Sequence, residues 1–285
     1  MTRFERGWRL ARRSLSVLRG KPSLALFPVV SAAVTLLAFA ALLAPGAALT
    51  ALDDAWWIAI PFAVVATYAA AFCAVYFNVA LAGAVARALD GRSAGLTDGL
   101  EIARGRRRAV ARWALVAATV GLVLQALQAA TAADNPVARL AGAIVAGLGG
   151  AAWAIATYFV VPILAFEELG PKAALARSAA LVRERWGEGV GGTAAIVTVV
   201  LLAGLVPAAA LVALALAAGG SLAIVAVAAA VAIVIGALVV GTALSTIFRV
   251  VLYRFAGDGR AVAGFAPAEL EGAFGSPALA IRART

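Results

Sequence analysis

Residues 189–248 read GVGGTAAIVTVVLLAGLVPAAALVALALAAGGSLAIVAVAAAVAIVIGALVVGTALSTIF and contain no charged side chain. A helix needs about 20 apolar residues to cross the roughly 30 Å hydrocarbon core of a bilayer, so the stretch is long enough for two crossings, 189–218 and 219–248. Both runs are continuously apolar and lack the period-two alternation of membrane-spanning strands. The stretch therefore predicts two transmembrane helices.

The rest of the chain has the same character. Hydrophobic residues make up 64% of the 285 residues and charged residues only 13%, against about 25% charged residues in an average soluble domain. Four further uncharged runs of membrane-spanning length are 22–52, 55–86, 113–133 and 140–166. The predicted fold class is all-α: a single integral membrane bundle of six transmembrane helices, with amphipathic helices in the cytoplasmic interface.

The basic residues predict how the bundle is oriented. The 24 Lys and Arg residues lie before the first helix, in the loops after the second and fourth helices, and after the sixth, with the sole exception of Arg139. Basic loops stay on the cytoplasmic side. We therefore expect a multi-pass protein of the cytoplasmic (inner or plasma) membrane with both termini inside. The net charge of +10 then predicts contact with anionic lipid headgroups rather than nucleic acid.

Each basic segment is followed by two apolar runs, which suggests three helical-hairpin repeats. The segments RSLSVLR (13–19) and RSAALVR (177–183) are similar, as are YFNVAL (76–81), YFVVPIL (158–164) and IFRVVLY (247–253), although a chain so rich in Ala and Arg also produces chance matches. The predicted divisions are an interfacial amphipathic helix 1–21, hairpin 22–86, cytoplasmic basic segment 87–112, hairpin 113–166, cytoplasmic amphipathic segment 167–188, hairpin 189–248 and cytoplasmic tail 249–285.

The segment 162–188, PILAFEELGPKAALARSAALVRERWGE, brings acids and bases together at the end of the fourth run. We interpret it as a structural junction in which the glutamates end that helix and pair with bases of the next one; a gate or a partner-docking site is the alternative. The candidate junction residues are Pro162, Glu167, Glu168, Gly170, Pro171, Lys172, Arg177, Ser178, Arg183, Arg185 and Trp186.

Catalytic chemistry finds little support in the sequence. The chain has no histidine, and its charged residues lie outside or at the ends of the apolar runs. Glu167 and Glu168 are adjacent, so on a helix they would not face each other as an acid/base pair. We expect no enzyme, cofactor or metal site. The strongest polar residues inside the runs, Asn78, Gln125 and Gln128, are expected to form contacts between helices, with a substrate contact as the alternative.

The block YFVVPILAFEELGPKAALARSAALVRERWGE (158–188), together with YFNVAL (76–81) and LTDGLEIARGRRRAVARWALVAATVGLVL (96–124), resembles a family of uncharacterised prokaryotic multi-pass membrane proteins of unknown function. More distantly, the chain is similar to the membrane domain of bacterial glycerophosphodiester phosphodiesterases. That similarity implies no catalytic residues, because the soluble catalytic domain has no counterpart in this chain.

These observations favour a non-catalytic membrane protein that organises or assembles membrane components and associates with itself. A transporter or channel for a hydrophobic or lipid-like substrate is the second hypothesis. An enzyme of lipid metabolism, with Glu167 and Glu168 as its best candidate residues, is the third.

Overall fold

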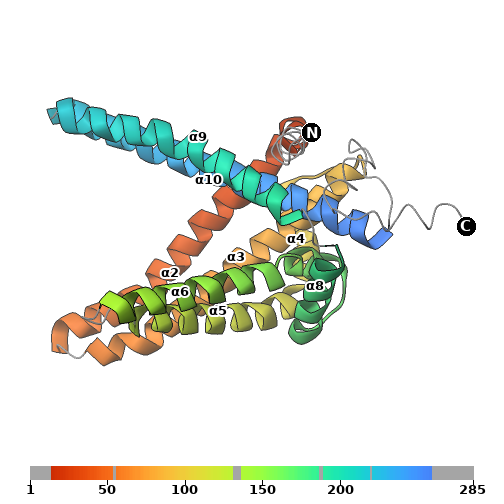
Figure 1. Ribbon diagram of the computed structural model, residues 1–285, viewed down its shortest axis with the longest axis horizontal. Coiled ribbons are helices and arrows are strands. Elements are labelled where there is room, and N and C mark those ends of the chain that lie inside the picture. Colours follow the sequence, from red (N-terminus) through yellow and green to blue (C-terminus); the bar gives the residue numbers. More distant parts are fainter. Residues whose placement is uncertain (1–13, 54–55, 131–135, 186–188, 219, 259–285) are drawn as a thin grey trace, which may run out of the picture. The chain divides into compact units, whose positions relative to one another are not determined.

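The computed structural model describes residues 14–53, 56–130, 136–185, 189–218 and 220–258 (Figure 1). Within these ranges the chain is almost entirely helical and contains no strand. Six helices are long and apolar enough to cross a membrane: Pro22–Ala51, Ala59–Leu89, Arg107–Ala129, Gly142–Phe166, Val200–Ala217 and Leu222–Ala256. The predicted all-α fold with six membrane-crossing helices is confirmed.

The chain divides into two compact units, and the division falls inside helices rather than between the predicted hairpins. One unit contains Met1–Pro28, Ala84–Gly95 and Arg185–Thr285, and the other contains Val29–Gly83 and Leu96–Glu184. Residues far apart in sequence thus share a core in each unit. The predicted threefold division of one domain remains a prediction.

In the first unit, residues 14–20 are helical and lead into the short 3-10 helix η1 (Pro22–Ala25). Helices α9 (Gly189–Ala218) and α10 (Gly220–Asp258) form a long antiparallel hairpin (Figure 1). The two helices approach closely at small residues, since a Cβ atom built at Gly204 would lie 2.5 Å from the Cβ of Ala237. Helix α10 continues ten residues beyond the predicted end at Phe248, because a helix can leave the bilayer without interruption.

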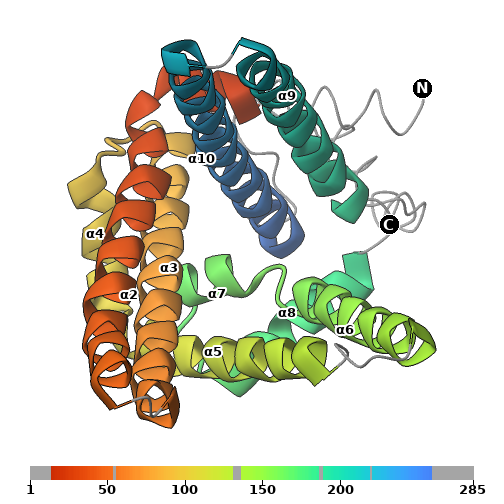
Figure 2. The same cartoon turned by 90° about the vertical axis from the view of Figure 1, so that its left-hand side faces the viewer.

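The second unit contains most of α2 (Leu26–Asp53) and α3 (Ala59–Leu89), which run alongside each other in Figure 2. The 3-10 helix η2 (Trp56–Ile58) precedes α3. The remaining helices of this unit are α4 (Leu96–Gly105), α5 (Arg107–Ala130), α6 (Pro136–Ala156), α7 (Val160–Phe166) and α8 (Pro171–Arg185). The predicted cytoplasmic basic segment 87–112 thus contains α4 and the first turns of α5, which begins within its arginine run.

The fourth crossing segment, Gly142–Phe166, is not one regular helix. It breaks between α6 and α7, at residues 157–159. Proline at position 162 explains the break, since its ring excludes the carbonyl group four residues earlier and it has no N–H to donate. Pro162 itself occupies the first turn of α7, where a missing N–H costs little.

The crossing helices present large apolar side chains at their surfaces. Leu216, Ile224 and Leu37 are 84%, 73% and 71% exposed. Polar groups are instead concentrated at the helix ends that carry the basic segments. This distribution is opposite to that of a soluble protein and matches a lipid environment.

Candidate functional site

The predicted junction lies at the end of α7, where the chain turns into α8. Glu167 is the C-cap residue of α7, and its Oε1 atom lies 3.7 Å from Nε of Arg177 on α8. Glu168 instead meets Arg106, which lies between α4 and α5, at 2.9 Å. The expectation that both glutamates would pair with bases of the following helix is therefore wrong for Glu168, because a nearer arginine comes from an earlier segment.

A buried hydroxyl group also ties α8 to the break between α6 and α7. The backbone N–H of Phe159 donates a hydrogen bond to Oγ of Ser178 at 3.0 Å, and Ser178 is fully buried. Phe159 is the N-cap residue of α7, so its N–H is one of those that a helix break leaves without a backbone acceptor. Ser178 supplies the missing acceptor.

The other predicted junction residues have structural positions. The carbonyl of Gly170 accepts the first intrahelical bond of α8 from Ala174 at 2.8 Å, and Pro171 begins that helix. Lys172 and Arg183 are exposed. Arg185 is the last residue of α8, while Trp186 lies outside the described residues. The junction thus consists of α7, a turn and α8, and it is held by one buried hydrogen bond and two ion pairs near the surface.

Replacing Ser178 with alanine is expected to lower the free energy of unfolding by about 1–3 kcal/mol, because it leaves the buried N–H of Phe159 without an acceptor. Ser14 provides a matched control, since it occupies the same place in the similar segment 13–19, is also fully buried, and its Oγ has no hydrogen-bond partner in the described chain. Ser14→Ala should leave the stability unchanged or raise it. Thermal unfolding in detergent would compare them; equal losses would contradict the assignment.

The polar residues within the crossing helices differ in what they contact. Nδ2 of Asn78 donates to the carbonyl of Ala74, one turn earlier in its own helix, at 2.8 Å. Gln125 and Gln128 are exposed on the last turns of α5. Four threonines, Thr67, Thr119, Thr157 and Thr242, likewise donate to carbonyls of their own helices. The expected contact between helices is therefore wrong for the hydrogen bond of the Asn78 amide, which stays within α3, because such side chains readily donate to a carbonyl one turn earlier.

In the first unit, a second site lies at the end of α3. Gly91 has φ of 72°, the N–H of Arg92 donates to the carbonyl of Arg87, and the N–H of Gly91 donates to that of Ala88. This pattern is a Schellman motif, in which a left-handed glycine ends a helix. The turn presents Asp90 beyond the last helical residue.

Asp90 is the centre of an ion-pair cluster. Arg254 of α10 donates to both carboxylate oxygens, at 2.6 and 3.2 Å, and Arg92 donates to Oδ2 at 2.7 Å. The hydrogen bond from Arg254 is the main reason that the pKa of Asp90 falls to about 2, with a further contribution from Arg92. The loop after this turn is fixed to η1, since Oγ of Ser23 donates to the carbonyl of Ala94 at 2.9 Å. The cluster holds α10 against the end of α3.

Sequence reasoning missed this cluster. Its local signal was the Asp90-Gly91 pair directly after an apolar run, which is typical of a helix C-terminus. The partner could not be found in the same way, because Arg254 is 164 residues away.

The Asp90 cluster predicts an acid-sensitive contribution to stability. A carboxylate whose folded-state pKa lies below its ordinary value of 3.8 stabilises the fold above that value, and the contribution disappears as the pH falls towards about 2. Asp90→Asn should therefore lower stability at pH 6, by about 1 kcal/mol for such a partly exposed pair, and should match the unmodified protein near pH 2.

Glu168→Gln serves as the control, because the side chain of Glu168 is 88% exposed. Its stability should match that of the unmodified protein at both pH values. Chemical unfolding in a mild detergent at pH 6, 4 and 2 would measure the differences. An Asp90→Asn deficit that persists at pH 2 would show that the carboxylate acts in another way.

These sites offer little for catalysis. Glu167, Glu168 and Asp90 each pair with an arginine, and the lowered pKa of Asp90 makes that carboxyl group a poor proton donor near neutral pH. In the described ranges, no group of three or more Cys, Asp or Glu residues is placed to hold a metal ion. The arrangement can fix helix ends in place and can present cationic groups to anions.

Comparison with known proteins gives one match. A family model described as "Family of unknown function (DUF6159)" matches residues 56–265. No curated protein and no solved structure matches the chain. The expected resemblance to uncharacterised membrane proteins thus has support at the family level, and nothing in the comparison links the chain to glycerophosphodiester phosphodiesterases.

Proposed function

We propose a membrane-organising role for this protein, which belongs to the DUF6159 family of unknown function because the family model matches residues 56–265, well over half of the chain. In this proposal the protein is non-catalytic, associates with itself, and organises or assembles components of the cytoplasmic membrane. Both termini and the basic segments face the cytoplasm in this proposal. Its cytoplasmic surface contacts anionic headgroups, and it needs no cofactor.

The observation that carries the proposal is how the polar groups are used. The carboxylates of Asp90, Glu167 and Glu168 each pair with an arginine at a helix end, so all three are engaged within the chain, and the least exposed pair, that of Asp90, ties two helices together. Thr67, Thr119 and the other hydrogen-bonded threonines of the crossing helices use their hydroxyl protons on carbonyls of their own helices. Such groups do not supply donors to a polar path through the membrane. This weakens the support for a transporter more than for a membrane-organising protein.

The exposed apolar surface of α9 and α10 also supports the proposal. Many large side chains along α9 and α10 are exposed, including Leu202, Val206 and Ile235 at 56%, 61% and 55%. In a bilayer such surfaces pack against lipid or against another helix. A protein that gathers copies of itself or other membrane proteins requires surfaces of this kind.

Self-association can be tested in liposomes of phosphatidylethanolamine and phosphatidylglycerol. Two populations of the protein, labelled with donor and acceptor dyes, are expected to retain energy transfer when the lipid-to-protein ratio is raised tenfold. Transfer that falls to the level of random encounters would contradict self-association. Saturable uptake of a defined hydrophobic solute by the same liposomes would favour the transporter instead.

The orientation is tested separately by labelling with a membrane-impermeant maleimide. Cys73 is replaced by alanine, and one cysteine is introduced either at Asp134, between the third and fourth crossing helices, or at Ala173, an exposed residue of α8. We expect intact cells to label Asp134→Cys and not Ala173→Cys, and inverted membrane vesicles to give the opposite result. Labelling of Ala173→Cys in intact cells would overturn the orientation.

A further inference from the structure

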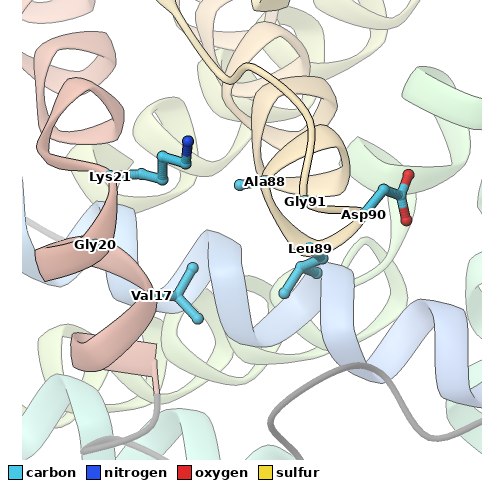
Figure 3. A pocket seen from close by; sticks show the side chains of 7 residues that line it. All are labelled: Val17, Gly20, Lys21, Ala88, Leu89, Asp90 and Gly91. Atoms are coloured by element: carbon cyan, nitrogen blue, oxygen red, sulfur yellow. The ribbon is translucent and has the colours of Figure 1, made fainter.

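A cavity in the first unit lies beside the Asp90 turn, between the helical residues 14–20 and the end of α3. Its volume is about 560 Å³, and its lining consists of Val17, Gly20, Lys21, Ala88, Leu89, Asp90 and Gly91 (Figure 3). Binding sites for small molecules typically measure about 300–1,000 Å³. The cavity is therefore large enough for a lipid headgroup with its glycerol linkage.

The charges around the cavity favour an anion. Asp90 already accepts hydrogen bonds from Arg254 and Arg92, and Figure 3 shows its carboxylate pointing away from Lys21. Lys21 extends towards the end of α3 and forms no ion pair within the described part of the chain. Arg254 and Arg92 do not line the cavity, but their ion pairs offset the charge of Asp90, so Lys21 is the cation of the lining that has no counter-ion in the described chain. The Lys21 amine is the free donor at the cavity.

The position and the remaining lining identify the class of anion. Lys21 directly precedes the crossing helix Pro22–Ala51, and Asp90 directly follows the crossing helix Ala59–Leu89, so the cavity lies where apolar helices end. Val17, Ala88 and Leu89 provide apolar walls next to the amine. An ion that is polar throughout would gain nothing from those walls. A phosphate that carries a glycerol and acyl chains would use both parts.

We propose that this cavity binds the phosphate group of an anionic phospholipid, with Lys21 contacting the phosphate and Val17 and Leu89 contacting the adjoining apolar part. The proposal deepens the headgroup contact in the proposed function and rests on it for the leaflet involved. Binding itself does not depend on orientation or self-association, so it can be measured independently of both.

Two substitutions test the two halves of the site. Lys21→Gln removes the charge and retains a similar length, and we expect about tenfold weaker binding. Gly20→Leu adds a bulky side chain to the lining of the cavity, and the fold should tolerate it because a Cβ atom at Gly20 meets nothing within 4 Å. It should weaken binding by at least as much. Gly91 is unsuitable for this test, because its φ of 72° would make any other residue strained.

The chain has only two lysines, and the second provides the matched control. Lys172 is exposed on α8, in the other unit, and Lys172→Gln removes the same charge without touching the cavity. Its affinity for lipid should stay within about twofold of the unmodified protein. Thermal unfolding of each variant in detergent would establish that it remains folded.

Binding is measured by native mass spectrometry of the detergent-purified full chain, titrated with phosphatidylglycerol, phosphatidylcholine or inorganic phosphate. We expect one tightly bound phosphatidylglycerol, weaker phosphatidylcholine binding because its headgroup has no net charge, and no displacement by equimolar inorganic phosphate. Equal effects of Lys21→Gln and Lys172→Gln would overturn the site. Displacement of the lipid by equimolar inorganic phosphate would overturn the lipid assignment and indicate a site for the free anion.

Discussion

Trp113→Ala is expected to lower the free energy of unfolding by about 3 kcal/mol, one of the largest losses for a single truncation in this chain. Trp113 is only 4% exposed at the start of α5. Its ring stacks on that of Trp153 in α6, with centroids 5.7 Å apart and an angle of 3° between the planes. Truncation leaves a cavity and removes the stack between the two helices.

Trp57 provides the control for this substitution. It precedes α3 and is 63% exposed, so Trp57→Ala should change stability by less than about 1 kcal/mol. Unfolding by a denaturing detergent, followed by circular dichroism, would compare the two variants. Adding Trp153→Ala completes a double-mutant cycle, in which the stacked pair should show a coupling energy of about 0.5–1.5 kcal/mol. Equal losses in Trp113→Ala and Trp57→Ala would contradict a structural role for the stack.

The number and type of the helices could be predicted because hydrocarbon thickness sets a minimum length for an apolar run. Helix ends were harder to predict, since charge marks where a chain leaves hydrocarbon and not where its hydrogen bonds stop. Helix α10 therefore runs past Arg249 to Asp258, and α5 begins within the arginine run at Arg107. The break that Pro162 causes in the fourth crossing segment lies one turn earlier, at residues 157–159.

The ion pairs differ in whether the sequence could predict them. Glu167 and Arg177 are ten residues apart on either side of a Gly-Pro turn, so their pairing follows from the sequence. Glu168 pairs across 62 residues and Asp90 across 164. No spacing rule selects one arginine among 22 at such distances, because the choice depends on which helices pack together. The same reason explains why the Lys21 cavity was not foreseen.

Small residues between α9 and α10 allow a second prediction with a large effect. Gly204→Leu is expected to destabilise the hairpin by more than the 1–3 kcal/mol typical of overpacking, because even its Cβ atom would lie 2.5 Å from the Cβ of Ala237. No rotamer change of an alanine can relieve that contact, so the helices must separate. Glycine at this position thus sets the distance between them.

Gly236→Leu is the matched control, because it introduces the same side chain into the same hairpin. A Cβ atom at Gly236 meets nothing within 4 Å, and leucine favours helix over glycine by several tenths of a kcal/mol. Gly236→Leu should therefore be neutral or stabilising. Thermal stability can be measured by size-exclusion chromatography after heating in detergent. Gly204→Leu should be less stable than the unmodified protein, and Gly236→Leu should be equally stable or more stable. Similar losses in both variants would mean that leucine is harmful at either position and that Gly204 does not set the helix spacing.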